Sequence, residues 1–135
     1  ISYAPGSFTI TKKNLTVSGV VVAPRQYDNT TVATLDFTGA SLATIVGMDD
    51  VIINAGGATG SFANENIGTG KAVTVTGVAL SGTTAGNYTV SQPTGVTGNI
   101  TERLVTVSAT AGQTKVYGAS DPAIYAYTLT SGVRA

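Results

Sequence analysis

The chain contains no cysteine, no histidine and no tryptophan, and only 10% of its 135 residues are charged. Without cysteine and histidine, a thiol nucleophile, a Cys/His zinc site and a Ser–His catalytic pair are all excluded. Disulfides are excluded as well, so packing and sheet pairing must stabilise the fold. The formal net charge is zero and the chain has only 7 lysines and arginines, so we expect no basic patch for nucleic-acid phosphates. No apolar run approaches the ~18 residues of a membrane span, so we expect no membrane insertion.

The abundant residues favour strands and turns. The sequence has 23 threonines, 16 valines and 17 glycines but only 6 leucines. β-Branched side chains pack well on pleated sheets and lose rotamer freedom in helices, whereas glycine marks turns and breaks helices. This composition, with few lysines and glutamates, is also typical of secreted bacterial surface proteins. We therefore predict an all-β, extracellular protein.

Short alternating segments, separated by Gly, Asn, Asp and Pro about every eight to twelve residues, predict a β-sandwich rather than a barrel of long strands. Strands are expected at residues 8–11, 15–22, 31–37, 51–54, 60–63, 72–80, 88–91, 96–101, 104–109 and 124–129. The three valines at 20–22 depart from alternation, as a strand buried on both sides or a bulge would. Residues 42–48 could form a single helical turn.

The stretch Gly68-Thr69-Gly70-Lys71 has the look of a phosphate-binding loop. That loop requires a glycine five residues before its second glycine, and a serine or threonine after its lysine. These positions hold Glu65 and Ala72. The residues that follow alternate like a strand, whereas a phosphate loop leads into a helix. We interpret the stretch as a tight turn ahead of a strand.

The sequence repeats part of itself at an offset of 90 residues. "ITKKNLTVSG" at 10–19 matches "ITERLVTVSA" at 100–109 without a gap, and the same offset pairs Arg25 with Lys115 and Tyr27 with Tyr117. A fixed period of this size marks tandem domains. We therefore expect residues 1–11 to be the closing strand of a preceding repeat, residues 12–101 one complete domain, and residues 102–135 the opening part of a following domain.

At these positions the chain resembles the YDG and MBG repeat domains of large bacterial surface adhesins, relatives of the filamentous-haemagglutinin group. The YDG-like segments are "RQYDNTTVATL" (25–35), "VGMDDVIINAGGATGSFANENIGTGKAVTVTGVALSG" (46–82), "AGNYTV" (85–90) and "GNITER" (98–103). The MBG-like segments are "KVYGASDPAIYAYTLTSG" (115–132) and "ISYAPGSFTITKK" (1–13). Asn29 replaces the eponymous glycine, and asparagine tolerates the left-handed conformation of a turn.

The resemblance implies an immunoglobulin-like β-sandwich that serves as a tandem repeat unit. It implies a structural stalk segment of a secreted adhesin on the bacterial cell surface, which holds a distal binding domain away from the cell. The family has no known catalytic residues, so we expect no enzyme, no catalytic, metal-binding or cofactor-binding residue, and no cofactor. The alternative is a binding module whose sandwich loops recognise a glycan, a protein or a surface.

The incomplete repeats at the two ends predict the partners of the chain. Val105, Val107, Ile124 and Leu129 would lack an opposing sheet, and an unpaired strand edge is a template for another chain. We expect these residues to contact neighbouring repeats of the same chain, or a neighbouring copy that donates residues 1–11 as a strand.

Polar side chains at several places leave alternatives open. Asp49 and Asp50 could bind calcium together with Asp28, Glu65 or a backbone carbonyl, although a turn that caps its own backbone explains the pair more simply. The four Asn-x-Thr triplets either accept glycans or arise by chance in a chain rich in both residues. They begin at Asn14, Asn29, Asn87 and Asn99.

Two further expectations concern aromatic and lysine side chains. Tyr27, Tyr88 and Tyr117 lie where strands meet turns, which favours rings in the core and hydroxyls on backbone carbonyls over a sugar-stacking surface. Lys71, near Glu65, could form an isopeptide crosslink to an asparagine, provided that all three groups are buried.

Overall fold

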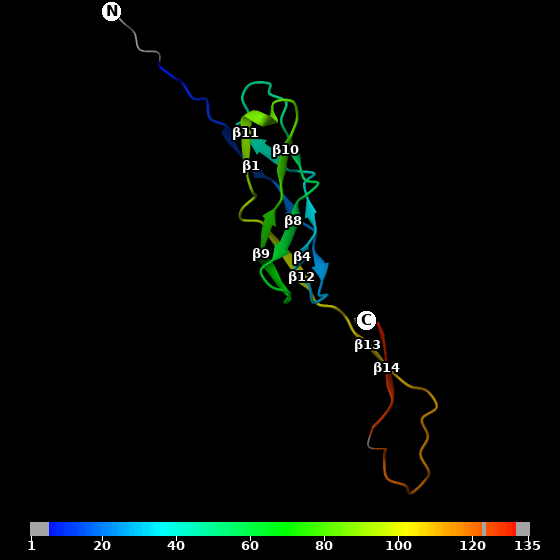
Figure 1. Cartoon of the computed structure of the whole chain (residues 1–135). Helices are drawn as coiled ribbons and strands as arrows, with labels where there is room; N and C mark the ends of the chain where they lie inside the picture. The colour runs from blue at the N-terminus through cyan, green and yellow to red at the C-terminus, as the bar shows by residue number, and fades with distance from the viewer. Residues whose placement is uncertain (1–5, 123, 132–135) are drawn as a thin grey trace, which may run out of the picture.

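The computed structural model describes residues 6–122 and 124–131, and within them the chain is all-β, as predicted (Figure 1). The helical element among these residues is a 3-10 turn, η1 (Ala85–Asn87). The strands are β1 (Lys13–Ser18), β2 (Val21–Val22), β3 (Arg25–Gln26), β4 (Val32–Ala33), β5 (Leu35–Asp36), β6 (Ser41–Ala43), β7 (Ile52–Asn54), β8 (Thr59–Phe62), β9 (Gly68–Thr76), β10 (Ala79–Ser81), β11 (Tyr88–Ser91), β12 (Thr97–Thr101), β13 (Thr106–Ala109) and β14 (Tyr127–Ser131). Residues 1–5, 123 and 132–135, which include parts of the two expected terminal repeats, lie outside the described residues.

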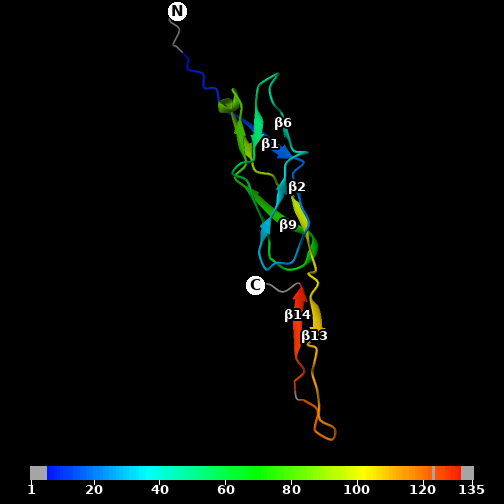
Figure 2. The same cartoon turned by 90° about the vertical axis from the view of Figure 1, so that its right-hand side faces the viewer.

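Strands β1 to β12 form a sandwich that is elongated in one direction (Figures 1 and 2). A five-stranded sheet has the order β3–β12–β9–β8–β4, and the pair β2–β5 packs against it. Toward the other end lie the three-stranded sheet β11–β1–β6 and the pair β10–β7. β1 pairs in parallel with β11, and β3 pairs in parallel with β12. Figure 1 shows that the chain enters the sandwich at β1, at one end, and leaves it from β12 at the other end.

Alternation of valine with threonine or serine along the strands builds the core. In β9, Val73 and Val75 are buried while Thr74 between them is exposed, because successive side chains of a strand point to opposite faces. The main core consists of buried side chains from both layers: Val17, Val22, Ala33, Phe62, Val73, Val75, Val78, Val96 and Ile100. A smaller cluster of Leu15, Val51 and Tyr88 fills the end near β11.

Two ribbons of similar construction run along the sandwich. In one, β1 and β2 pair with β6 and β5; in the other, β9 and β10 pair with β8 and β7. Each ribbon bends at a glycine with φ of 79°, Gly19 or Gly77. A Cβ atom at Gly19 would collide with the carbonyl group of Gly39, and one at Gly77 with that of Gly57. The two bends therefore require glycine, both for the left-handed backbone and for the close approach of the turn that joins the two partner strands.

Several sequence expectations about strands are wrong in detail. The expected strands at 31–37 and 72–80 are each divided in two, into β4 and β5 and into β9 and β10. The expected strand at 15–22 is interrupted by the bend at Gly19, and Val20 to Val22 form neither a doubly buried strand nor a bulge, since Val21 is exposed and Val22 buried. Residues 42–48 do not form the expected helical turn: Leu42 and Ala43 belong to strand β6, which pairs with β1, and Thr44 and Gly47 have positive φ. Residues 8–11 form no strand, and Phe8 and Ile10 are fully exposed.

β13 and β14 form a separate antiparallel hairpin beyond the sandwich (Figure 2). Its apolar side chains remain largely in solvent, among them Val105, Val107, Tyr127 and Leu129. The hairpin thus has strand pairing but no core of its own among the described residues. The expected partner, a neighbouring repeat or copy, stays a prediction.

Candidate functional site

The stretch Gly68–Lys71 is a bulge inside a strand, which corrects the prediction of a turn ahead of one. β9 begins at Gly68, and the register with β12 shifts where Thr69 and Gly70 together oppose Asn99. Gly70 has φ of 60°, and its N–H donates to Asn99 Oδ1 over 2.9 Å. The extra residue and the positive φ are typical of a glycine bulge. The Gly70 N–H, which a phosphate loop would direct at its ligand, is therefore used within the sheet.

Lys71 does not have the surroundings that an isopeptide crosslink requires. Its Nζ donates to Asn64 Oδ1 over 2.6 Å, and this hydrogen bond lies at the surface. Asn64 is exposed and Glu65 is half-buried. The contact closes the loop between β8 and β9, and the burial on which the crosslink hypothesis depends is missing.

Arg25 organises the loop that follows β3. Its guanidinium forms an ion pair with Asp28, and Nη1 also donates to Thr30 Oγ1 over 2.8 Å. A second nitrogen, Nη2, donates to the Thr30 carbonyl oxygen. The guanidinium carbon lies 5.3 Å from the centre of the Phe62 ring, which is within the range of a cation–π contact. The side chain of Arg25 is only 16% exposed, so the cluster joins the loop to the main core.

Asp28 completes this cluster with a local turn. Its Oδ1 accepts hydrogen bonds from the Thr30 hydroxyl (2.8 Å) and the Thr30 N–H (3.0 Å). These bonds, the hydroxyl bond first, and the ion pair with Arg25 lower the pKa of Asp28 from its ordinary value. Asn29 has φ of 61°, as expected for an asparagine in place of glycine. The Tyr27 hydroxyl donates to Asn29 Oδ1 (3.0 Å), so the predicted bond to a backbone carbonyl is wrong for Tyr27.

Asp49 and Asp50 point to different partners far along the chain, which corrects the expectation that they cap their own turn. Asp49 Oδ2 accepts a 2.6 Å hydrogen bond from the Tyr88 hydroxyl. Asp50 Oδ2 accepts from both the N–H (2.8 Å) and the hydroxyl (3.0 Å) of Thr83, and these bonds lower the pKa of Asp50. Within residues 6–122 and 124–131, no group of three or more Asp, Glu, His or Cys side chains could hold a metal ion.

Tyr88 is buried in the smaller core, as predicted, and its hydroxyl is bonded twice. It accepts from the Val46 N–H (3.2 Å) and donates to Asp49, so its partner is a carboxylate instead of a backbone carbonyl. The bond to Asp49, followed by burial, raises the pKa of Tyr88. Tyr117, in contrast, is fully exposed, and the core position predicted for it is wrong. Among the described residues, its hairpin has no opposing sheet.

The four Asn-x-Thr triplets differ in how their asparagine side chains are used. Asn14 bonds to Ser91 and Thr89, Asn29 to Tyr27, and Asn99 to Gly70. Asn87 lies exposed at the end of η1.

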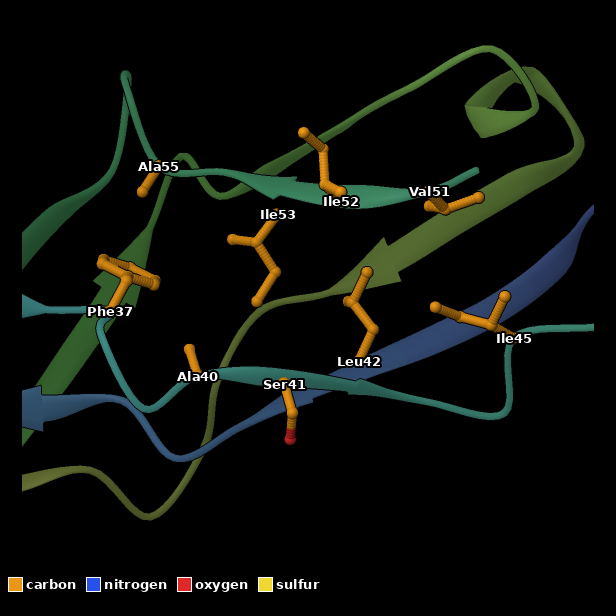
Figure 3. A pocket seen from close by; sticks show the side chains of 9 residues that line it. All are labelled: Phe37, Ala40, Ser41, Leu42, Ile45, Val51, Ile52, Ile53 and Ala55. Atoms are coloured by element: carbon orange, nitrogen blue, oxygen red, sulfur yellow. The ribbon is translucent and has the colours of Figure 1, made fainter. Parts of the chain in front are cut away.

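A shallow groove of about 330 Å³ opens between β6 and β7 (Figure 3). Leu42 on one strand and Ile53 on the other point toward each other across it, with Phe37, Ile45 and Val51 beside them. Ser41, whose hydroxyl is the single polar side-chain group in the lining, points away. A sugar or a charged ligand would need convergent polar groups, and this lining does not provide them.

The hydrogen bonds of Arg25 and Asp50 hold loops at the two ends of the sandwich. A comparison with known families identifies the family to which this sandwich belongs. Residues 11–95 match the model of the YDG domain. The chain belongs to the YDG domain family. No curated protein and no solved structure is similar enough to the chain to be matched to it.

In this YDG domain the motif residues are structural. Tyr27 and Asp28 bond within their own loop, and Asn29 adopts the conformation that a glycine would provide. Sequence reasoning recognised the motif but missed Arg25 as its centre, because the partners of a guanidinium depend on the fold. It also missed Gln92, whose amide makes two 2.9 Å hydrogen bonds to the backbone of Val78. A glutamine ahead of a proline gave no signal of that role.

Proposed function

We propose that this YDG domain is a structural unit in the stalk of a secreted bacterial cell-surface adhesin, where it holds a distal binding domain away from the cell. The observation that carries the proposal is the path of the chain. It enters the elongated sandwich at β1 and leaves it from β12 at the opposite end (Figure 1). Units joined in this way extend a protein in one direction instead of forming a cluster.

The polar groups of the domain support a structural role. Arg25, Asp28, Asp49 and Asp50 are all engaged in hydrogen bonds within the fold. Covalent catalysis uses a nucleophile activated by a neighbouring base, and glycoside hydrolysis uses two carboxylates that face one cleft. We propose no catalytic activity for the domain. The described residues include no helix long and apolar enough to cross a membrane.

We assign the sandwich to the immunoglobulin-like class as part of this proposal. Two packed layers of short strands support the assignment, as does the parallel pairing of the first strand, β1, with the late strand β11. The proposed partners are neighbouring repeats of the same chain, or a neighbouring copy that donates a strand. The exposed side chains of the β13–β14 hairpin are the surface that such a partner would cover.

The alternative is a binding module that uses its loops. The groove between β6 and β7 gives it little support, because the lining is almost entirely aliphatic or aromatic. The loops at both ends of the sandwich are occupied by their own hydrogen bonds. We therefore favour the stalk.

The length of tandem arrays tests the proposal. The maximum dimension of chains with one, two and four copies of the 90-residue period, measured by small-angle X-ray scattering, should increase by a constant increment for each added copy. The increment should be at most about 45 Å, from ~3.3 Å per residue along the fourteen residues 88–101. Arrays whose maximum dimension hardly grows would contradict a stalk. Labelling of intact bacteria with an antibody against the sandwich tests the cell-surface location.

A further inference from the structure

Both terminal strands of the sandwich are held by parallel pairs. β1 pairs with β11 from Lys13 opposite Tyr88 to Thr16 opposite Ser91. β12 pairs with β3 at the far end, with Ile100 opposite Arg25. β11 continues through residues 92–96 into β12. The strand that enters the sandwich is thus paired directly with the segment that leads out of it.

This arrangement determines how the sandwich responds to a stretching force applied at its two ends. Tension at Lys13 draws β1 outward at one end, and tension at Thr101 draws β12, and with it β11, toward the other end (Figure 1). The two parallel strands are then pulled in opposite directions along their length. All hydrogen bonds between them are strained together, whereas pulling two strands apart from one end breaks the bonds in sequence.

Side chains fasten the β1–β11 pair in addition to the backbone. Asn14 Nδ2 donates to Ser91 Oγ over 2.8 Å, and Asn14 Oδ1 accepts from Thr89 Oγ1 over 3.1 Å. One side chain therefore bonds to two positions of the neighbouring strand. On the other face of β1, Leu15 is completely buried and packs with Tyr88 of β11.

The exit of the chain is fastened in a similar way. The Tyr27 N–H donates to the Thr101 carbonyl oxygen over 2.9 Å, and Thr101 Oγ1 donates to the Arg25 carbonyl oxygen over 3.3 Å. These bonds continue the β3–β12 pair to the last residue of β12. The Arg25 cluster in turn fixes β3 against Phe62.

We propose that the β1–β11 pair, whose strands are also joined by the side-chain hydrogen bonds of Asn14, is a mechanical clamp: it resists unfolding of the domain when the chain is pulled along its long axis. The biological need for such a clamp rests on the proposed stalk function, since a stalk under pull transmits force from end to end. The mechanical property itself belongs to the sandwich and is measurable whatever the domain does in the cell.

Single-molecule force spectroscopy can compare two directions of pull on the whole chain. The chain has no cysteine, so introduced cysteines are unique attachment points. Lys12→Cys with Glu102→Cys, both exposed, pulls β1 and β11 past each other. Lys12→Cys with Gly86→Cys pulls the same two strands apart from one end, and a Cβ at Gly86 meets only open space. We expect a several-fold higher unfolding force in the first direction; equal forces would overturn the proposal.

A pair of matched variants tests the role of Asn14. Asn14→Ala should raise the rate of forced unfolding in the first direction about threefold to tenfold, the range for one or two net hydrogen bonds lost. Thr59→Ala is the control, because it removes an exposed hydroxyl pair, Thr59 with Thr76 (3.0 Å), from the antiparallel β8–β9 pair. We expect the control to change the rate little. Equal effects of the two variants would overturn the proposal.

Two further measurements keep the outcome unambiguous. Equilibrium urea unfolding measures the loss of stability for Asn14→Ala and for Thr59→Ala, so that a difference under force that exceeds the difference at equilibrium reports the direction of pull. If Asn14→Ala fails to fold, Ser91→Ala removes one of its two bonds and should give a smaller effect of the same sign. Arrays that fail to lengthen would contradict the stalk function but not the mechanical clamp. Equal unfolding forces in both directions would contradict the clamp but not the stalk function.

Discussion

Val17 and Val107 occupy equivalent places in two segments that match at an offset of 90 residues, yet Val17 is 8% exposed and Val107 60%. The same holds for Leu15 and Val105, at 0% and 48%. Both segments form strands, and both pair antiparallel with a later strand, β1 with β6 and β13 with β14. Pairing thus arises within about thirty residues of chain, whereas burial requires a second layer from residues further along.

The bend in the first ribbon marks a second difference between the two segments. Gly19 has its counterpart in Ala109, the last residue of β13. At Gly19 the ribbon turns from one sheet toward the other, and the partner backbone approaches too closely for a side chain. At Ala109 an ordinary strand pair with Tyr127 continues. The two matching segments therefore both form a strand, but they differ at the residue where the first segment bends from one sheet of the sandwich to the other.

The largest expected contrast is between two tyrosines. Tyr88→Ala should lower the free energy of unfolding by about 3–5 kcal/mol, the range for large buried aromatic side chains. Tyr117→Ala should change it by less than ~0.5 kcal/mol, because that ring is fully exposed. Urea titration followed by circular dichroism measures both. A loss below ~1 kcal/mol for Tyr88→Ala would place the ring outside the core.

The two aliphatic counterparts give the next contrast. Leu15→Ala should cost about 2–5 kcal/mol, since it leaves a cavity beside Val51 and Tyr88. Val105→Ala should cost less than ~0.5 kcal/mol in the isolated chain. A loss at Val105 comparable to that at Leu15 would mean that a partner already covers the hairpin, in line with the proposed contact to a neighbouring copy.

The bend should produce a smaller contrast of the same kind. Gly19→Ala places a Cβ against the carbonyl group of Gly39 on a backbone with φ of 79°, and we expect a loss of about 1–3 kcal/mol. The reverse change at the counterpart, Ala109→Gly, should cost at most ~1 kcal/mol, the usual penalty of glycine in a strand. Thermal melting of the two variants compares them, and similar melting temperatures would show that the bend tolerates a side chain.

The sequence predicted most of the strands and the family, but not the side-chain hydrogen bonds that connect distant segments of the sandwich. Period-two alternation identified β11 at its observed bounds and the core position of Tyr88. The prediction of a strand at residues 8–11 is wrong. An alternating pattern shows which side chains a strand could bury, but a strand needs an opposing sheet to bury them. The partners of Asp49 and Asp50 lie 39 and 33 residues away. Local turn chemistry predicts only near partners, so an Asx turn was the expectation there.

The smallest expected effect is a dependence of the sandwich on pH. Asp50 accepts two hydrogen bonds from Thr83, Asp28 two from Thr30, and Asp36 two from Thr38. These bonds favour the ionised carboxylates, so the folded-state pKa of each lies below its ordinary value of 3.8. The unfolded chain therefore takes up protons first as the pH falls. The stability that these bonds contribute is present above pH 3.8 and is lost as the pH falls through the folded-state pKa values.

Urea midpoints measured across this acidic range should accordingly decline toward low pH. Asp50→Asn keeps an amide oxygen that can accept from the Thr83 N–H but cannot be protonated in this range, so its midpoint should decline less steeply than that of the parent chain. Val105→Ala is the matched control, because it alters the hairpin and leaves all three carboxylates in place; its decline should parallel that of the parent. An Asp50→Asn curve as steep as the parent's would assign the acid sensitivity to other groups, and would show that the fastening at Thr83 contributes to geometry without contributing to pH-dependent stability.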